Sequence, residues 1–321
     1  MGITKKRLII NFIKKILFKT NIKNPNIKDD YDLDISKNYK YEIKKYEYII
    51  TTNKGIFLIS KNKKKRILNL KLGFFGIAKY KNYIYVACYG NGHSKGCIYK
   101  FNIISNYLKY EKIVYTKKFQ YFHEITIYKD NLYIVDSSWI TPQENLIKFD
   151  INDNGDLTNK IIFDVKKSLP NKHRNSCHIN SISFKNDLIY ILFHNLTWYT
   201  NLRSKVFIFK IIKERIKFIK ESTLFKIFFL SSAHDIDVHN RSILNSANSS
   251  FVKNNKILRF KNFFLKGYLQ TSKKIIIGIN KNYKNDKSKI NKNFLAIINK
   301  KNLKTINKIP VKYFINSILK L

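Results

Sequence analysis

The chain has 321 residues, 44% of them hydrophobic and 15% aromatic, which is enough apolar material for a large core and excludes general disorder. Only 10 Gly and 4 Pro are present, and no apolar run reaches the roughly 18 residues of a membrane-spanning helix, so collagen-like and integral membrane architectures are excluded. The net charge of +41 would attract nucleic acid or anionic lipid, but its lysines are spread along the whole chain with many Asn and Ile, so we attribute it to base composition and expect no specific nucleic-acid binding.

The N-terminal segment Ile3–Lys19 has the spacing of a basic amphipathic helix, with Lys14 and Lys15 interrupting any signal-peptide core. We expect this helix either to bind an anionic membrane surface or partner groove, or to cap the folded body. A polar linker follows, so residues 1–45 are predicted to be an arm and linker. With three cysteines and no CxxC spacing, no disulfide framework is encoded, and we expect a cytoplasmic protein. Peripheral membrane contact through residues 3–19 is one of the alternatives for the arm.

From about Tyr46 the pattern changes to short β-rich runs separated by polar turns. A template of two apolar alternations around a Lys, Asn or Asp turn repeats about every 50 residues. It fits these segments: Gly76–Val86, Glu124–Ile134, Ser181–Ile191, Asp235–Asn245 and, more weakly, Gly267–Ile277. With a partial unit at Tyr48–Ile59, the repeat predicts an all-β, six-bladed β-propeller over residues 46–321, and five or seven blades are also compatible with the pattern. A two-sheet sandwich is the alternative.

A third apolar strand follows most of these hairpins, and each such strand ends in an aromatic residue. The predicted third strands are Cys97–Phe101, Asn145–Phe149, Lys205–Phe209 and Lys256–Phe260.

Histidines stand at the start of three consecutive units, where the first strand of a propeller blade runs beside the central channel. His123, Asn180 and His234 occupy one register, and the other two units place Phe75 and Lys266 there. His178 lies two residues before Asn180, on the same face of an extended strand. These side chains are therefore expected to converge near the propeller axis.

Three roles fit the converging histidines. His123, His178 and His234 can hold a divalent metal ion as the cofactor, or one of them can act as base or nucleophile. Glu124, Asn180, Asp235 and Lys266 are then expected to bind the ligand, with Lys266 favouring an anion. In the third role, the histidines satisfy buried polar groups at the blade junctions.

The segments His123–Ile125, His178–Ile182, His234–Ile236, Phe264–Tyr268 and Ile277–Asn280 resemble a bacterial family of uncharacterised β-propeller proteins over about Leu72 to Lys281. The resemblance implies the fold. The His178 and His234 segments are also similar to arylsulfotransferase-type propellers, in which a channel histidine carries the sulfate. The arginine that follows the His-Asn strand in that family is absent here, where Phe193-His194-Asn195 stands.

The function predicted from these features is binding of a small polar or anionic ligand at a histidine-lined channel, with catalysis there left open. The alternative is a non-enzymatic scaffold that recruits a protein, an anionic membrane surface or nucleic acid. Neither a nucleotide-binding glycine loop nor a nucleophile elbow occurs in the chain, which disfavours nucleotide-dependent and α/β-hydrolase chemistry.

Overall fold

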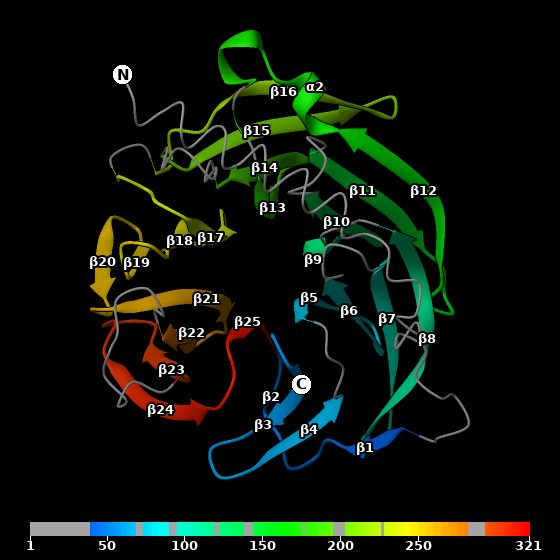
Figure 1. Ribbon diagram of the computed structural model, residues 1–321, viewed down its shortest axis with the longest axis vertical. Coiled ribbons are helices and arrows are strands. Elements are labelled where there is room, and N and C mark those ends of the chain that lie inside the picture. The colour runs from blue at the N-terminus through cyan, green and yellow to red at the C-terminus, as the bar shows by residue number, and fades with distance from the viewer. Residues whose placement is uncertain are drawn as a thin grey trace, which may run out of the picture. The chain divides into compact units, whose positions relative to one another are not determined.

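The computed structural model describes residues 39–68, 73–89, 95–118, 122–137, 144–174, 176, 178–194, 203–225, 228–281 and 293–321 (Figure 1). The chain divides into two units, Met1–Lys37 and Asn38–Leu321. The predicted amphipathic arm falls in the first unit, outside the described residues. The second unit folds into six antiparallel sheets arranged as a six-bladed β-propeller, which confirms the predicted fold.

The first three blades follow one another in the chain. The strands of blade 1 are β5 (Gly73–Tyr80), β6 (Tyr83–Tyr89), β7 (Lys95–Ile104) and β8 (Tyr107–Lys118). The strands of blade 2 are β9 (Phe122–Tyr128), β10 (Asn131–Ser137), β11 (Glu144–Ile151) and β12 (Leu157–Asp164). After the short helices α2 (Val165–Ser168) and η1 (Asn171–His173) come the strands of blade 3, β13 (Ile179–Lys185), β14 (Leu188–Phe193), β15 (Lys205–Ile212) and β16 (Arg215–Glu221).

The last three blades complete the ring. The strands of blade 4 are β17 (Ala233–Asp237), β18 (Ser242–Asn245), β19 (Ser250–Lys253) and β20 (Lys256–Arg259). The strands of blade 5 are β21 (Phe263–Gln270), β22 (Lys274–Lys281), β23 (Asn293–Asn299) and β24 (Thr305–Val311). The strands of blade 6 are β25 (Ile315–Lys320), β2 (Tyr48–Thr52), β3 (Gly55–Ile59) and β4 (Lys64–Leu68).

Blade 6 is built from both ends of the second unit. Its innermost strand, β25, comes from the C-terminal end of the unit and pairs with β2 near the other end. The unit predicted at Tyr48–Ile59 is therefore present, but it supplies the second and third strands of its blade and not the strand beside the axis. This pairing closes the ring, because it removes two free sheet edges.

Two boundaries differ from those expected from the sequence. Lys256–Phe260 is predicted as a third strand, but β20 is the fourth strand of blade 4. The strands β18 and β19 have only four residues each. They form a complete hairpin in a segment where the 50-residue template expects a single strand and the turn after it. In addition, β1 (Lys40–Glu42) lies in the predicted linker but pairs with β8 at the outer edge of blade 1.

The core lies between the blades. Five clusters of buried apolar side chains are each drawn from two neighbouring blades. For example, Tyr128 of blade 2 stacks on Phe184 of blade 3 with ring centroids 4.5 Å apart. Full burial of an aromatic or aliphatic side chain contributes roughly 1.5–3 kcal/mol, so these sheet-to-sheet faces hold the ring together.

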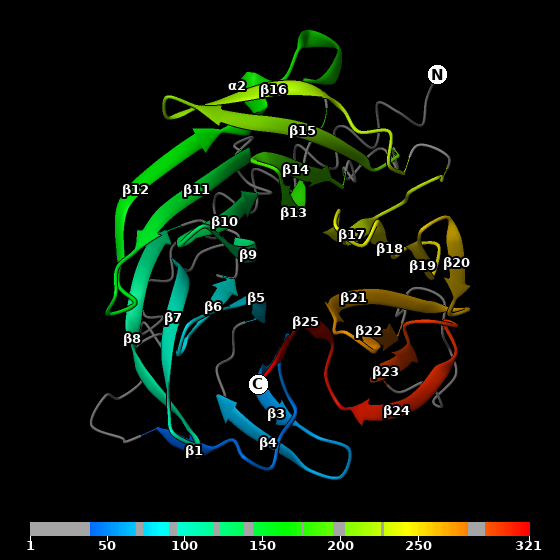
Figure 2. The same ribbon diagram turned by 180° about the vertical axis from the view of Figure 1, so that it is seen from behind.

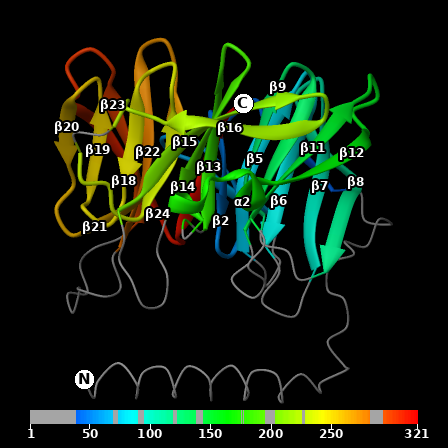
Figure 3. The same cartoon turned by 90° about the horizontal axis from the view of Figure 1, so that it is seen from above.

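The innermost strands β5, β9, β13, β17, β21 and β25 contact one another in this order around the axis, and the view from behind shows the same ring (Figure 2). Seen edge-on, many of the strands run roughly along the direction of the propeller axis (Figure 3). Residues at one register of the six innermost strands therefore face a common space. No helix within the described residues is long and apolar enough to cross a membrane.

Candidate functional site at the propeller axis

Every innermost strand is irregular at the same point. Its pairing with the second strand of the blade shifts register at, or directly beside, one residue of each blade. A β-bulge of this kind bends the strand and redirects side chains, and bulges are frequent beside functional sites. The six residues, which we call the axial residues, are Phe75, His123, Asn180, His234, Lys266 and Asn316.

All six axial residues line one cavity. Four of the residues that directly follow them, Gly76, Glu124, Asp235 and Ser317, complete its wall. The free volume of the cavity is about 10 Å³, which is close to the lower limit for one water molecule. The axis is therefore occupied by side chains, with space for a single small group between them.

The structure brings the predicted site residues together. His123, Glu124, Asn180, His234, Asp235 and Lys266 all line the cavity. His178 lies just outside this wall, and the centroid of its ring is 4.6 Å from that of His123. The convergence expected from the repeat alignment is thus observed.

Two further residues belong to the site and are missed by sequence reasoning. Asn316 is the axial residue of blade 6. The repeat pattern begins this blade at Tyr48–Ile59 and not at β25, because the blade joins the two ends of the unit. His194 follows β14, and its ring lies between those of His178 and His234, at 5.3 and 5.0 Å. The sequence signal that could have identified His194 is its position directly after the second strand of blade 3. In an antiparallel hairpin, the end of the second strand lies beside the start of the first strand.

Four imidazoles therefore form a continuous row, which we call the histidine arc: His123, His178, His194 and His234. Phe75 packs on His123 at one end, and Phe264 packs on His234 at the other. Burial lowers the pKa of all four, that of His194 to about 3, and the charge of Lys266 lowers each of them further. The arc is neutral at physiological pH.

The histidines differ in their hydrogen bonding. His234 Nδ1 lies 2.8 Å from the Ser232 carbonyl oxygen, which requires the proton on Nδ1 and leaves a lone pair on Nε2. By contrast, both ring nitrogens of His123 and of His194 are buried without a hydrogen-bond partner among the described residues. Buried polar atoms are nearly always paired, so these four nitrogens require a partner, such as a water molecule or a ligand, that the described side chains do not supply.

Glu144 fixes the backbone beside the arc. Its two carboxylate oxygens accept hydrogen bonds from the backbone N–H groups of His178 (2.6 Å) and Ile179 (2.9 Å). His178 has a φ of +61°, in the left-handed region that a residue with a side chain seldom adopts. The carboxylate thus holds a strained residue in the position from which its ring reaches His123.

The carboxylates in the wall tie neighbouring blades together. Glu124 Oε2 accepts a hydrogen bond from the Ile182 N–H at 3.2 Å, and Asp235 Oδ2 accepts one from the Gly267 N–H at 3.0 Å. Burial raises the pKa of both carboxyl groups, against the lowering effect of these hydrogen bonds and of Lys266. Glu124 and Asp235, which are expected to bind the ligand, therefore also have a structural role between the blades.

Lys266 is the cation of the site, and only 9% of it is exposed. Its Nζ lies 4.2 Å from the centroid of the Phe75 ring, while no hydrogen bond or ion pair within 4.0 Å joins this atom to another described residue. Burial lowers its pKa to about 8, although Asp235 and Glu124 act in the opposite direction. The cavity thus contains an ammonium group that lacks an acceptor among the described residues.

The metal hypothesis gains no geometric support. Within the described ranges, no group of three or more His, Cys, Asp or Glu side chains is placed to hold a metal ion. In the arc, His123 meets His178 edge to face at 80°.

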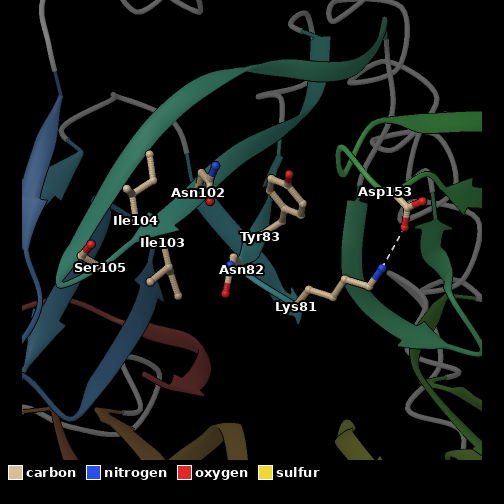
Figure 4. Close-up of a pocket in the computed structure, with 8 residues that line it drawn as sticks. All are labelled: Lys81, Asn82, Tyr83, Asn102, Ile103, Ile104, Ser105 and Asp153. Carbon is tan, nitrogen blue, oxygen red and sulfur yellow. Dashed lines mark hydrogen bonds and ion pairs between the residues drawn. The ribbon is translucent and has the colours of Figure 1, made fainter.

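A larger pocket of about 350 Å³ lies at the β5–β6 and β7–β8 turns of blade 1, beside Asp153 in the β11–β12 turn of blade 2 (Figure 4). Its charged pair, Lys81 and Asp153, is joined at 3.0 Å, with side chains that are 54% and 98% exposed. An exposed, paired surface of this kind is ordinary solvated surface. We therefore place the candidate site at the axis.

Comparison with known proteins adds only general likenesses. No protein-family model matches the chain, and no curated protein matches it. Among solved structures, a Lactobacillus plantarum protein is similar with a TM-score of 0.49 and 8% identity over 86% of this chain and 99% of its own. The dihydro-heme d1 dehydrogenase NirN gives 0.39 and 8% over 85% and 74%, and the Myxococcus xanthus glutaminyl cyclase gives 0.34 and 12% over 76% and 92%. None of the three bears on function, and the likeness to arylsulfotransferases rests on the sequence motifs alone.

Proposed function

We propose that this propeller binds a small anion in its axial cavity, with the ammonium group of Lys266 as the anchor. The observation that carries the proposal is the state of this group, which is buried beside the axis and has no acceptor among the described residues. A buried charge without a hydrogen-bond acceptor is strongly unfavourable. Asp235 and Glu124 compensate the charge of Lys266 only at longer range, and a bound anion would supply the missing acceptor.

The balance of donors and acceptors supports an anion over a neutral polar ligand. Lys266 offers three N–H donors, while the neutral rings of His123 and His194 offer one donor and one acceptor each, so the surplus of donors comes from the ammonium group. The amide donors of Asn180 and Asn316 are already directed to the carbonyl oxygens of neighbouring blades, at 3.2 and 2.7 Å. A ligand that only accepts hydrogen bonds matches this surplus of donors.

The scaffold alternative has less support. In a pure scaffold, the buried histidines would satisfy polar groups at the blade junctions. His234 does so through Ser232 and Ser246, but the nitrogens of His123 and His194 have no such partner among the described residues. These unpaired atoms favour a ligand site.

The test is chloride binding, followed by the line width of the ³⁵Cl nuclear magnetic resonance signal, which increases when chloride exchanges with a protein site. The parent should broaden the signal, and Lys266→Met should remove this contribution. Lys253→Met is the matched control, because Lys253 is as buried as Lys266 and loses the same charge, but its Nζ donates to Gln270 Oε1 away from the cavity. Equal broadening by all three proteins would refute the proposal, since it would come from the general positive surface.

A further inference from the structure

We infer that Phe75 is the specificity-determining residue of the axial site and restricts it to monatomic anions of halide size. The inference rests on the proposed function and adds the class of ligand. It also assigns a role to the one axial residue that has no polar side-chain atom.

Phe75 stands between the anchor and the arc. Its ring lies 4.2 Å from Lys266 Nζ on one side and 5.4 Å, centroid to centroid, from the His123 ring on the other. An anion that approaches Lys266 must share this space with the ring. The largest side chain of the cavity wall is thus placed beside the charge that would bind the ligand.

The backbone at Phe75 is held by the neighbouring blade. Thr51 Oγ1 donates a hydrogen bond to the Phe75 carbonyl oxygen at 2.6 Å, and Asn316 Nδ2 donates one to the Phe74 carbonyl oxygen at 2.7 Å. On the other side, a Cβ on Gly76 would lie 2.5 Å from the Ile125 backbone nitrogen, so blade 2 is already in close contact. Phe75 is therefore fixed from both sides and cannot retreat by a small shift of its strand.

The free volume defines what fits. About 10 Å³ admits one atom the size of a water oxygen, and a halide is the anion nearest to this size. Acetate and sulfate carry three and four heavy atoms around a centre, and each would have to displace the ring of Phe75. Because protein cores are densely packed and deform little, such displacement is costly.

The experiment compares chloride, bromide, acetate and sulfate with the parent, Phe75→Ala and Phe75→Leu by isothermal titration calorimetry at constant ionic strength. The parent should bind the two halides and neither oxyanion. Phe75→Ala should raise the affinity for acetate relative to chloride by about tenfold or more, because the removed ring leaves a cavity beside Lys266. Phe75→Leu retains apolar packing and serves if the alanine variant does not fold; it should change the ratio in the same direction.

Phe264→Ala is the matched control. Phe264 is a half-buried aromatic residue of an innermost strand that touches the arc at His234, but it does not line the cavity. It should leave the ratio of acetate to chloride affinity unchanged. A parent that binds acetate as tightly as chloride, or a Phe75 series with an unchanged ratio, would overturn the inference and leave the proposed function standing. Absence of any anion binding to the parent would instead remove the proposed function itself.

Discussion

Two buried lysines of this propeller occupy opposite environments. Lys100, on β7, is 3% exposed, and its Nζ lies 3.0 Å from both Glu111 Oε2 and Asp156 Oδ1. It also donates to the Asn154 carbonyl oxygen and lies 4.4 Å from the centroid of the Tyr83 ring. Lys266 is 9% exposed, with the Phe75 ring beside it and no acceptor among the described residues.

The pKa values follow this difference. Burial lowers the pKa of Lys100, but the hydrogen bonds to Glu111 and Asp156 outweigh it, so the pKa is raised. Burial lowers the pKa of Lys266 to about 8, because the carboxyl groups of Asp235 and Glu124 lie more than 4.0 Å from its Nζ and offset burial only in part. The same residue type thus forms close ion pairs at the junction of blades 1 and 2, and at the axis it has no acceptor within 4.0 Å among the described residues.

Lowering the pH should produce the largest change in unfolding free energy, and the groups at the axis should titrate before the other buried groups. The pKa values of the four arc histidines are lowered, so their stabilising contribution is present above about pH 6.5 and is lost as the pH falls, when the unfolded chain binds the extra protons. The raised pKa values of Glu124 and Asp235 act oppositely, because the folded state retains their protons. The raised pKa of Glu144 beside the arc acts in the same direction as those of Glu124 and Asp235. Four histidines less three carboxyl groups leaves a net of about one to two protons, or about 1–3 kcal/mol of unfolding free energy per pH unit between about pH 6 and 5.

Urea unfolding from about pH 7 to 4.5 measures this slope. The ion pairs of Lys100 with Glu111 and Asp156 should lose their stabilising contribution only at lower pH. The pKa of Asp156 is lowered, so its contribution persists until the pH falls below about 4. A flat unfolding free energy between about pH 7 and 5 would contradict the neutral, buried arc.

Lys100→Met should lower the unfolding free energy by about 1–3 kcal/mol, because it removes a buried cation that contacts Glu111, Asp156 and the Asn154 carbonyl. The loss is limited because Asp156 retains Lys112 and Glu111 retains Asn102 as partners. Equilibrium urea unfolding at about pH 7 gives the value. Chloride binding should be unaffected, and a variant as stable as the parent would show that this ion-pair cluster contributes nothing.

Lys266→Met should raise the unfolding free energy by about 1–2 kcal/mol at about pH 7 in the absence of bound anion, since it removes a charge that folding desolvates. The penalty from a pKa of about 8 is fully present below pH 8 and is relieved as the pH rises toward about 10.5, where the unfolded lysine also loses its proton. The advantage of the variant should therefore shrink between about pH 7 and 9.5. Destabilisation at neutral pH would mean that Lys266 is paired after all.

The smallest effect is expected for His123→Phe, at about 1 kcal/mol of added stability, because the ring contacts with Phe75 and His178 are retained while two unpaired nitrogens disappear. Thermal unfolding in chloride-free buffer at about pH 7.5 is the measurement. A clear loss of stability would show that the nitrogens of His123 are hydrogen-bonded in the folded protein.

The position of the axial residues is predictable to an unusual degree. The turn that follows each first strand repeats at a fixed distance, so His123, Asn180, His234, Phe75 and Lys266 fall into one register on local pattern alone. The sixth, Asn316, does not, because no local pattern states that the last strand of the chain completes a blade begun by residues 48–68. His194 is missed for a related reason, since it reaches the arc from the end of a second strand.

By itself, the sequence determined the all-β class, the six repeated units and the register at which one residue of each blade approaches the axis, because strand alternation and turn chemistry are local properties. Only the tertiary structure decided how that register is used. The bulges at all six positions, the unpaired state of Lys266 among the described residues and the ties from Glu124 and Asp235 to the next blade depend on which strands become neighbours. Hydrogen-bond satisfaction and desolvation are set by those neighbours, so no property of a single strand can specify them.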